Sequence, residues 1–212
     1  HFWLYLGMNE VWVRLLPVIF GIASVAVIYK LGLLIDGKKV AIVSALLLAI
    51  NPYHIWYSQE ARPYMLFLLL GLLSTLFLLQ KRWWMFTAAL ILMVYTNYFS
   101  VFLIIGYIFH VLLFNRSQLK KLLISLISLL IFYLPWLPNF LIQLKTGTNG
   151  LFSGWTGVVS DHPVKALLLT LAKFSVGKVS LSKNPLFVIL ILPVILIFFY
   201  SLVILYRDKN HR

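Results

Sequence analysis

The stretch from Asn51 to Tyr64 gathers the polar groups of this sequence that could perform chemistry. It contains a carboxylate (Glu60), a guanidinium (Arg62), an imidazole (His54) and an amide (Gln59) among aromatic neighbours. An arginine can bind a phosphate through two parallel hydrogen bonds, and a carboxylate can orient or deprotonate a hydroxyl group. Because the whole chain has 5 acidic residues, a carboxylate placed here predicts a site for a phosphorylated ligand and a hydroxyl acceptor.

Each of these groups also has a structural interpretation. Glu60 and Arg62 could form a salt bridge that fastens two helix ends, and Arg14, the second candidate cation, could be an interfacial arginine. Tyr57 and Tyr64 could stack on a sugar or belong to an aromatic belt, and the imidazole could be a packing group. The site residues that we expect are Glu60 as the catalytic group and, for binding the substrate and a carrier phosphate, Arg62, Arg14, Gln59, Tyr64, Tyr57 and His54, with no metal ligand among them.

Pro52 and Pro63 bracket these polar groups and predict where the flanking helices end and begin. Proline fixes φ, cannot donate a hydrogen bond to a helix and disfavours the helical conformation in the residue before it. We therefore expect one helix to end near Asn51 and another to begin near Pro63. The groups between them should face the membrane surface and not the interior of a span.

The composition identifies an integral membrane protein. Of the 212 residues, 62% are hydrophobic and 11% are charged, whereas a soluble domain is about 45–50% apolar and about 25% charged. The net charge is +13, but the basic residues lie mostly in short segments between apolar runs. This pattern indicates membrane topology and anionic head groups, with no nucleic-acid partner. The absence of cysteine excludes disulfide bonds and thiolate metal sites.

The apolar runs predict an all-α, polytopic transmembrane helix bundle of about seven spans. The run 83–114 is too long for one span, and we divide it at the polar break 96–98. The 139–185 connection should include a helix over 163–174 that lies on the membrane surface, with Asp161 as its N-cap. The expected spans are 15–35, 40–51, 63–79, the two halves of 83–114, 122–138 and 186–206.

We expect residues 1–212 to form one transmembrane domain. The sequence starts with His1 and is mid-membrane soon afterwards, which indicates a fragment that lacks its first span and first outer loop. The basic residues orient the domain, because short cytoplasmic loops are enriched in lysine and arginine. This places 51–64, 97–100 and 139–185 on the outer face. The 11 of 18 basic residues on the opposite side are Lys30, Lys38, Lys39, Lys81, Arg82, Arg116, Lys120, Lys121, Arg207, Lys209 and Arg212.

The run Ser-Gln-Glu-Ala-Arg-Pro-Tyr at 58–64, preceded by Asn51-Pro52, resembles the outer-face motif of a family of bacterial membrane glycosyltransferases. This is the protein-mannosyltransferase and aminoarabinose-transferase type of the GT-C superfamily, glycosyltransferase family 39. The resemblance covers most of residues 1–140 and is specific at 51–64. Other segments that resemble the family in the same order are His1–Tyr5, Glu10–Gly21, Asp36–Lys39, Asn97–Phe99 and Pro135–Pro138.

The resemblance implies an enzyme that moves a sugar from a polyprenyl-phosphate carrier to an acceptor on the outer face of the bacterial plasma membrane. Arg62 would bind the carrier phosphate, and Glu60 would be the second acidic position of the outer loops. The family's general base would be an aspartate just before His1, so this fragment alone is expected to be inactive. Asn97 stands where many members of the family have a histidine. The resemblance does not identify a cofactor, and a divalent metal is one candidate.

The residues leave two other classes of function open. A transporter or lipid flippase would place ionisable residues near the middle of its spans and show internal symmetry, whereas here the charges sit at span ends. A membrane assembly or binding subunit, or a catalytically incomplete relative, would keep the fold without the activity. The expected partners are the polyprenyl-phosphate-sugar donor, membrane lipids and an acceptor that the residues do not identify.

Overall fold

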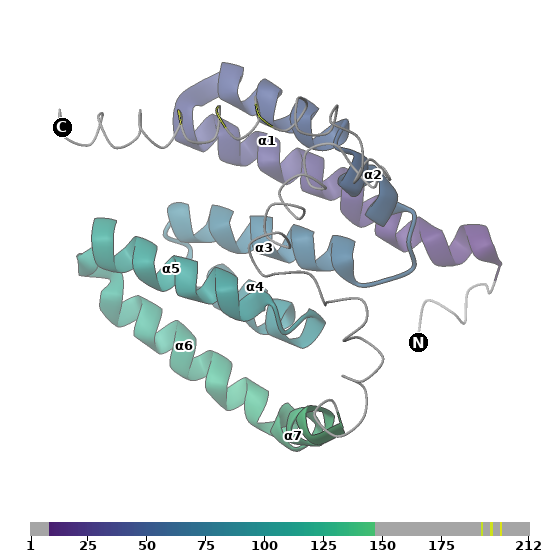
Figure 1. Ribbon diagram of the computed structural model, residues 1–212. Coiled ribbons are helices and arrows are strands. Elements are labelled where there is room, and N and C mark those ends of the chain that lie inside the picture. Colours follow the sequence, from purple (N-terminus) through teal and green to yellow (C-terminus); the bar gives the residue numbers. More distant parts are fainter. Residues whose placement is uncertain (1–8, 147–191, 193–195, 197–199, 201–212) are drawn as a thin grey trace. The chain divides into compact units, whose positions relative to one another are not determined.

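The computed structural model describes residues 9–146 together with residues 192, 196 and 200. Contacts divide the chain into two compact units, residues 1–50 with 54–152 and residues 51–53 with 153–212. All the elements in the described part are helices, which confirms the all-α prediction there (Figure 1). They are α1 (Glu10–Ala49), α2 (Pro52–Ser58), α3 (Tyr64–Leu79), α4 (Trp83–Thr96), α5 (Ser100–Phe114), η2 (Arg116–Gln118), α6 (Leu119–Tyr133), η3 (Leu134–Trp136) and α7 (Leu137–Thr146).

Helix α1 is a helical hairpin that doubles back on itself (Figure 1). The turn is at Asp36 and Gly37, whose backbone angles are not helical, and Gly37 has φ +82°, a conformation that glycine adopts without a steric penalty. The two arms approach closely because Gly32 has no side chain: a Cβ there would lie 2.5 Å from Ala41 Cα. The hairpin confirms that 15–35 and 40–51 are separate helical segments.

The predicted breaks at the prolines and at 96–98 are confirmed. Helix α1 ends at Ala49, α3 begins directly after Pro63, and α4 ends at Thr96 before an extended Asn97. The short helix α2 was not predicted. It forms because Asn51 Oδ1 accepts a hydrogen bond from Tyr53 N at 2.9 Å, while a proline at the first helical position loses no backbone bond there.

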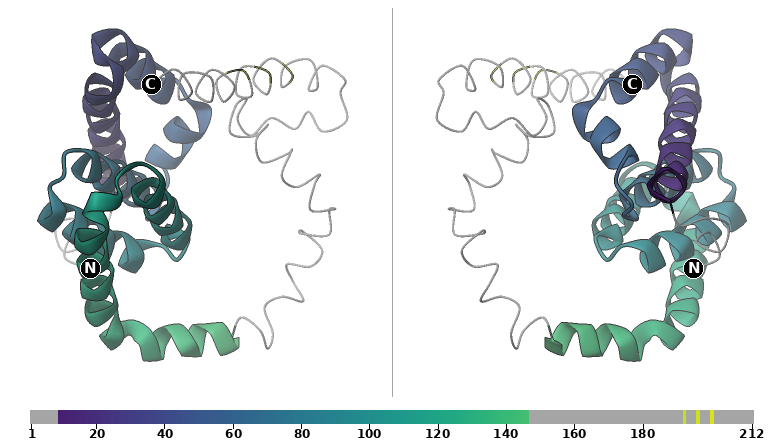
Figure 2. Two further views of the ribbon diagram at one scale, coloured as in Figure 1. Left: turned by 90° about the vertical axis from the view of Figure 1, so that its left-hand side faces the viewer. Right: turned by 90° about the vertical axis from the view of Figure 1, so that its right-hand side faces the viewer.

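The core lies along α3, which packs against α1 and α4, while α4 packs on α6 (Figure 2). Apolar residues fill these contacts, among them Phe86, Leu90 and Met93, which are fully buried. Polar groups join the helices as well, since the Tyr107 hydroxyl on α5 lies 2.7 Å from Ser74 Oγ on α3. In a bilayer, close packing and interhelical hydrogen bonds replace water exclusion as the force that holds helices together.

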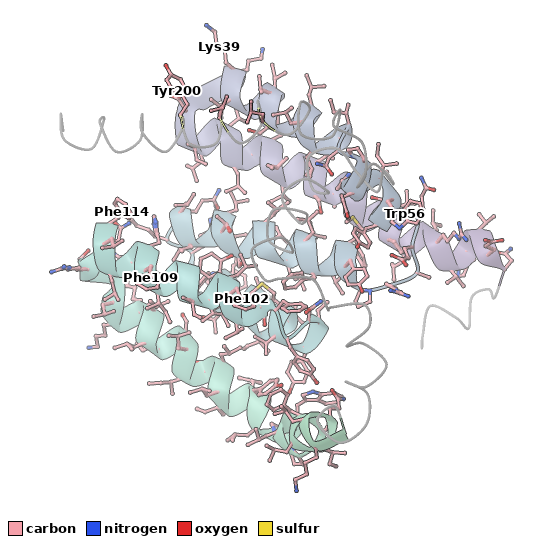
Figure 3. All side chains as sticks on the ribbon, viewed as in Figure 1. Lys39, Trp56, Phe102, Phe109, Phe114 and Tyr200 are labelled. Carbon is pink, nitrogen blue, oxygen red and sulfur yellow. The ribbon has the colours of Figure 1, made fainter. Side chains whose placement is uncertain are left out.

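The outer faces of the helices are apolar. Phe102, Phe109 and Phe114 lie along α5 (Figure 3), and each is more than half exposed. An apolar surface of this kind suits lipid better than water. Two helical runs, Glu10–Ala49 and Arg116–Lys145, are long and apolar enough to cross a membrane, whereas α3, α4 and α5 are shorter apolar helices. The bundle is therefore confirmed as helical, but seven spans are not confirmed.

The predicted break of the sixth span at 135–138 is confirmed, but the residues that follow it are a correction. We expected Pro135-Trp136-Leu137-Pro138 to break that helix, with a connection starting at residue 139. Helix α6 ends at Tyr133 and η3 follows it, but a new helix, α7, then runs from Leu137 to Thr146 and leaves α6 at a steep angle (Figure 2). Pro138 lies in the first turn of α7, where proline is tolerated, so the start of the expected connection is helical.

Three predictions fall outside the described residues. They are the surface helix over 163–174 with its N-cap Asp161, the last span over 186–206 apart from residues 192, 196 and 200, and the part of the 139–185 connection after Thr146. The assignment of residues 1–212 to one domain stays a prediction.

Candidate functional site

The stretch between α1 and α3 folds as one short helix followed by a tight turn. After α2, Gln59 N donates to Trp56 O at 3.1 Å and Arg62 N donates to Glu60 O at 2.7 Å. This turn exposes Gln59 and Arg62, while Glu60 is partly covered. Gln59, Glu60 and Arg62 are therefore presented at a helix end, whereas His54 lies within α2.

Glu60, Arg62, Tyr64 and Tyr57 form one cluster. Arg62 Nε lies 3.4 Å from Glu60 Oε1, and the arginine side chain is 62% exposed. A hydrogen bond to Tyr64, followed by the charge of Glu60, raises the pKa of Arg62 above its ordinary value. The rings of Tyr57 and Tyr64 meet edge to face, with centroids 4.8 Å apart. The cluster offers a permanent positive charge, a neighbouring carboxylate and a phenol in a single accessible place.

The ion pair bears out the structural interpretation of these two residues and is compatible with the chemical one. An exposed ion pair contributes little to stability, because water screens it and its side chains lose freedom. A phosphate that forms bidentate, charge-assisted hydrogen bonds can therefore compete with Glu60 for Arg62. Such a ligand would also release the Glu60 carboxylate to contact a second substrate.

Helix α2 is held on α1 by contacts at Gly21. A Cβ on Gly21 would collide with Ser58 Oγ, so the absence of a side chain there lets the two helices approach. His54 is buried at the same place and forms a hydrogen bond with the backbone of Gly21. Burial lowers the pKa of His54, and this bond opposes part of the shift. These contacts give His54 a part in positioning the stretch.

Arg14 is engaged elsewhere. On α1 it forms an ion pair with Glu10, one turn away, and both side chains are at least half exposed. The structure therefore joins Arg62, Glu60, Tyr64 and Tyr57, while the ion pair it records for Arg14 lies outside that cluster. A role for Arg14 in binding the phosphate stays a prediction.

A second polar and aromatic cluster lies at the C-terminal ends of α4 and α6. The Tyr98 hydroxyl donates to Gln143 Oε1 at 2.6 Å and accepts from Trp136 Nε1 at 3.3 Å. The Tyr95 ring packs edge to face on Trp136, and the Tyr98 ring packs in the same way on Phe140. Sequence reasoning noted 97–99 and 135–138 separately but missed their contact, because only the continuation of the helix to Thr146 brings Gln143 to Tyr98.

The described part of the chain gathers no cluster of metal-binding side chains. Over 9–146 no group of three or more histidine, aspartate and glutamate side chains comes together. The residues described there therefore do not fit a metal site built from protein ligands alone.

One comparison with known proteins identifies the family. The family model for dolichyl-phosphate-mannose-protein mannosyltransferase matches residues 2–141, which is about two thirds of the chain and includes the whole of 51–64. The chain belongs to this family. No curated protein and no solved structure gave a significant match.

Membership confirms the resemblance at 51–64 and places the protein among membrane-integral glycosyltransferases that use polyprenyl-phosphate sugars as donors. The apolar helical runs agree with a membrane location. The cluster around Arg62 lies within the matched residues, as does the aromatic cluster apart from Gln143.

Proposed function

We propose that this protein transfers a sugar from a polyprenyl-phosphate carrier to a hydroxyl acceptor at the outer face of the bacterial plasma membrane. The observation that carries the proposal is the Arg62, Glu60 and Tyr64 cluster at an exposed helix end, in a member of a glycosyltransferase family. The outer face is supported by the basic residues, since 11 of 18 lie at the opposite ends of the predicted spans.

In this proposal, Arg62 binds the phosphate of the carrier. When the bond between the sugar and the phosphate oxygen breaks, negative charge grows on the leaving phosphate. A guanidinium fixed by Tyr64 stabilises that charge without having to reorganise. The exposure of Arg62 allows a phosphate at the membrane surface to reach it while the polyprenyl tail stays in the lipid.

Glu60 acts on the acceptor. The carboxylate orients the attacking hydroxyl by accepting its hydrogen bond. As the new bond to the sugar forms, the proton passes to the general base that the family resemblance implies in the first outer loop, and the electron pair of the broken bond stays with the carrier phosphate. Tyr57 supports one face of the sugar by stacking. Gln59, exposed beside Glu60, is available to bind a sugar hydroxyl, and His54 and Gly21 hold the stretch in place.

The test is sugar transfer by the full-length protein, purified in detergent and supplied with a radiolabelled polyprenyl-phosphate sugar. Arg62→Ala is expected to lower kcat by about 100-fold or more, because it removes a group that stabilises the leaving phosphate. Glu60→Gln should lower it by a similar factor of about 100.

Lys39→Ala is the matched control, because it removes one exposed positive charge far along the chain from the cluster and should leave the rate unchanged. Wild-type rates for both Arg62→Ala and Glu60→Gln would refute the proposed roles.

A further inference from the structure

The rings of the aromatic cluster form a continuous ladder between the ends of α4 and α6 and the start of α7. Neighbouring rings meet edge to face, with centroids 5.2–6.3 Å apart. Aromatic pairs in this geometry stabilise each other beyond the area that they bury, so the rings are held in place without a ligand. This aromatic ladder consists, in order, of Trp136, Tyr95, Tyr133, Phe140 and Tyr98.

The polar tips of three of these rings are bonded to the protein. The Tyr95 hydroxyl donates to the Phe132 carbonyl oxygen at 2.6 Å. The Tyr98 hydroxyl lies between Trp136 Nε1, from which it accepts, and Gln143 Oε1, to which it donates. In an aromatic belt the hydroxyl or indole N–H faces the wet side of the interface while the ring lies in lipid. The bonded tips indicate a different use of these rings.

Two rings of the aromatic ladder are open to a ligand. Tyr95 is 45% exposed and Tyr98 is 44% exposed. Because their hydroxyls are bonded to the protein, these rings lose little freedom when a ligand stacks on them. The Gln143 side chain is exposed, and while its Oε1 accepts from Tyr98, its N–H₂ group can donate to a ligand hydroxyl.

The aromatic ladder lies at the same end of the bundle as the Arg62 cluster. Helices α3 and α4 pack on each other and are joined by a short turn, so they run antiparallel. The start of α3, which follows Glu60 and Arg62, is therefore next to the end of α4, where Tyr95 and Tyr98 lie. Packed helices have axes about 8–10 Å apart, which is longer than one sugar ring. A carbohydrate that contacts both places must therefore have more than one sugar unit.

The chemistry of the aromatic ladder favours a neutral carbohydrate. Its side chains are uncharged at neutral pH, so they do not attract a phosphate or a charged head group. An extended peptide commonly binds by adding to the edge of a sheet, whereas the elements of the described part of the chain are helices. A sugar ring has an apolar face of C–H groups that can stack on an aromatic ring, and hydroxyls at its edge that can bind an amide.

We infer that the aromatic ladder binds the acceptor of the reaction and that this acceptor is a neutral oligosaccharide. Its role as the acceptor rests on the proposed function, whereas the binding of a sugar to these rings does not. One sugar unit stacks on Tyr95 and Tyr98, and one of its hydroxyls accepts a hydrogen bond from the Gln143 amide. The oligosaccharide continues toward Glu60, which orients the hydroxyl that attacks.

The test is saturation-transfer NMR of the full-length protein in a detergent that has neither sugar nor aromatic groups. Irradiation of the aromatic protons marks any ligand that stacks on a ring. The ligands are trisaccharides of mannose, glucose or galactose and, as the alternative acceptor, a neutral peptide that carries one threonine and no aromatic residue. The C–H protons of at least one trisaccharide are expected to receive saturation, and the peptide is expected to receive none.

Substitutions at Tyr95 separate stacking from folding. Tyr95→Leu removes an exposed ring and should weaken trisaccharide binding about tenfold, whereas Tyr95→Phe keeps the ring and should bind within about threefold of the wild type. Phe109→Leu is the matched control, because Phe109 is 59% exposed on α5 (Figure 3) and lies outside the aromatic ladder. In a transfer assay with the same trisaccharide, the loss in Tyr95→Leu should fall on KM and not on kcat.

The inference is overturned if no trisaccharide receives saturation, if Phe109→Leu weakens binding as much as Tyr95→Leu, or if Tyr95→Phe loses as much as Tyr95→Leu. Stronger saturation of the peptide than of every trisaccharide would identify a peptide acceptor and would also overturn it. The proposed function fails separately, since wild-type transfer by Arg62→Ala and Glu60→Gln would refute it whether or not a trisaccharide binds.

Discussion

The two ends of helix α3 show how one apolar helix can present two different kinds of polar site. At its first end, Arg62 and Glu60 are accessible and already paired with each other. At its other end, Trp83 and Gln118 each bury an unpaired polar atom beside a basic turn. Two exposed charges that pair with each other can give up that ion pair, so that each binds a reacting ligand. Atoms as deeply covered as Trp83 Nε1 and Gln118 Oε1 are out of reach of such ligands.

Helix α1 repeats this contrast with two glycines. Gly32 brings the two arms of the hairpin together backbone to backbone, whereas Gly21 meets the side chain of Ser58 on α2. The first contact builds the bundle, and the second positions the candidate catalytic stretch. Substitutions at the two glycines should therefore separate stability from the placement of α2.

The largest effect is expected for Gly32→Ala. The new Cβ would lie 2.5 Å from Ala41 Cα and 2.7 Å from Ala41 N, and backbone atoms cannot move aside as a side chain can. The substitution should destabilise the hairpin by about 3 kcal/mol, measured as a lower Tm in detergent. Gly106→Ala is the control, because a Cβ there meets nothing within 4 Å. Equal Tm values for the two variants would show that the hairpin is not packed in this way.

A smaller effect is expected for Gly21→Ala. Its Cβ would collide with Ser58 Oγ, and the displacement of α2 should lower the free energy of unfolding by about 1–2 kcal/mol. Chemical denaturation measures this change. Adding Ser58→Ala removes the oxygen in the way and should restore part of the loss, since the next nearest atom, Ser58 Cβ, would be 3.2 Å away. Strictly additive losses in the double variant would argue against this contact.

The smallest effect is expected for the contribution of His54 to the pH dependence of stability. Burial lowers its pKa in the folded protein below the ordinary value of 6.5, so the unfolded chain binds a proton at a higher pH than the folded one. The stability from neutral His54 is complete above about pH 6.5 and is lost as the pH falls through the folded pKa.

The Tm of the wild type should therefore fall between pH 7.5 and pH 5.5, and His54→Gln should reduce that fall. His110→Gln is the control, because it removes a histidine but leaves the His54–Gly21 contact intact. If His54→Gln and the wild type show the same pH dependence, His54 is not held neutral by burial.

Local rules allowed several helix boundaries to be predicted from the sequence. Pro52 and Pro63 mark breaks because proline lacks an N–H group and fixes φ, and Asn97 and Gly37 lie where the helices stop or turn. The same rules predicted the break after α6 but not the new helix α7, which begins at Leu137 and continues to Thr146 because proline is tolerated in a first turn. The short helix α2 was missed because Pro52 was expected only to end the preceding helix, whereas proline is also tolerated at the first position of a new one.

The candidate site was predictable in its composition and only partly in its geometry. Residue types and spacing were enough to select Glu60 and Arg62, since charged residues in an apolar chain are few. The pairing of Tyr64 with Arg62 follows from side-chain positions in the turn, which no spacing rule predicts. The ion pair of Arg14 with Glu10 has the i, i+4 spacing of neighbours on one helix, so the sequence could have revealed it.

The amino-acid sequence by itself determined that this is an apolar, helical membrane protein, where several of its helices break, and which family motif it carries. These are properties of composition and of neighbouring residues, and they do not depend on how the helices pack. The tertiary structure decided that Gly21 seats α2 on α1, that Tyr98 meets Gln143, and that Trp83 and Gln118 share a cavity. Such contacts join residues far apart in the chain, so they exist only once the helices have packed.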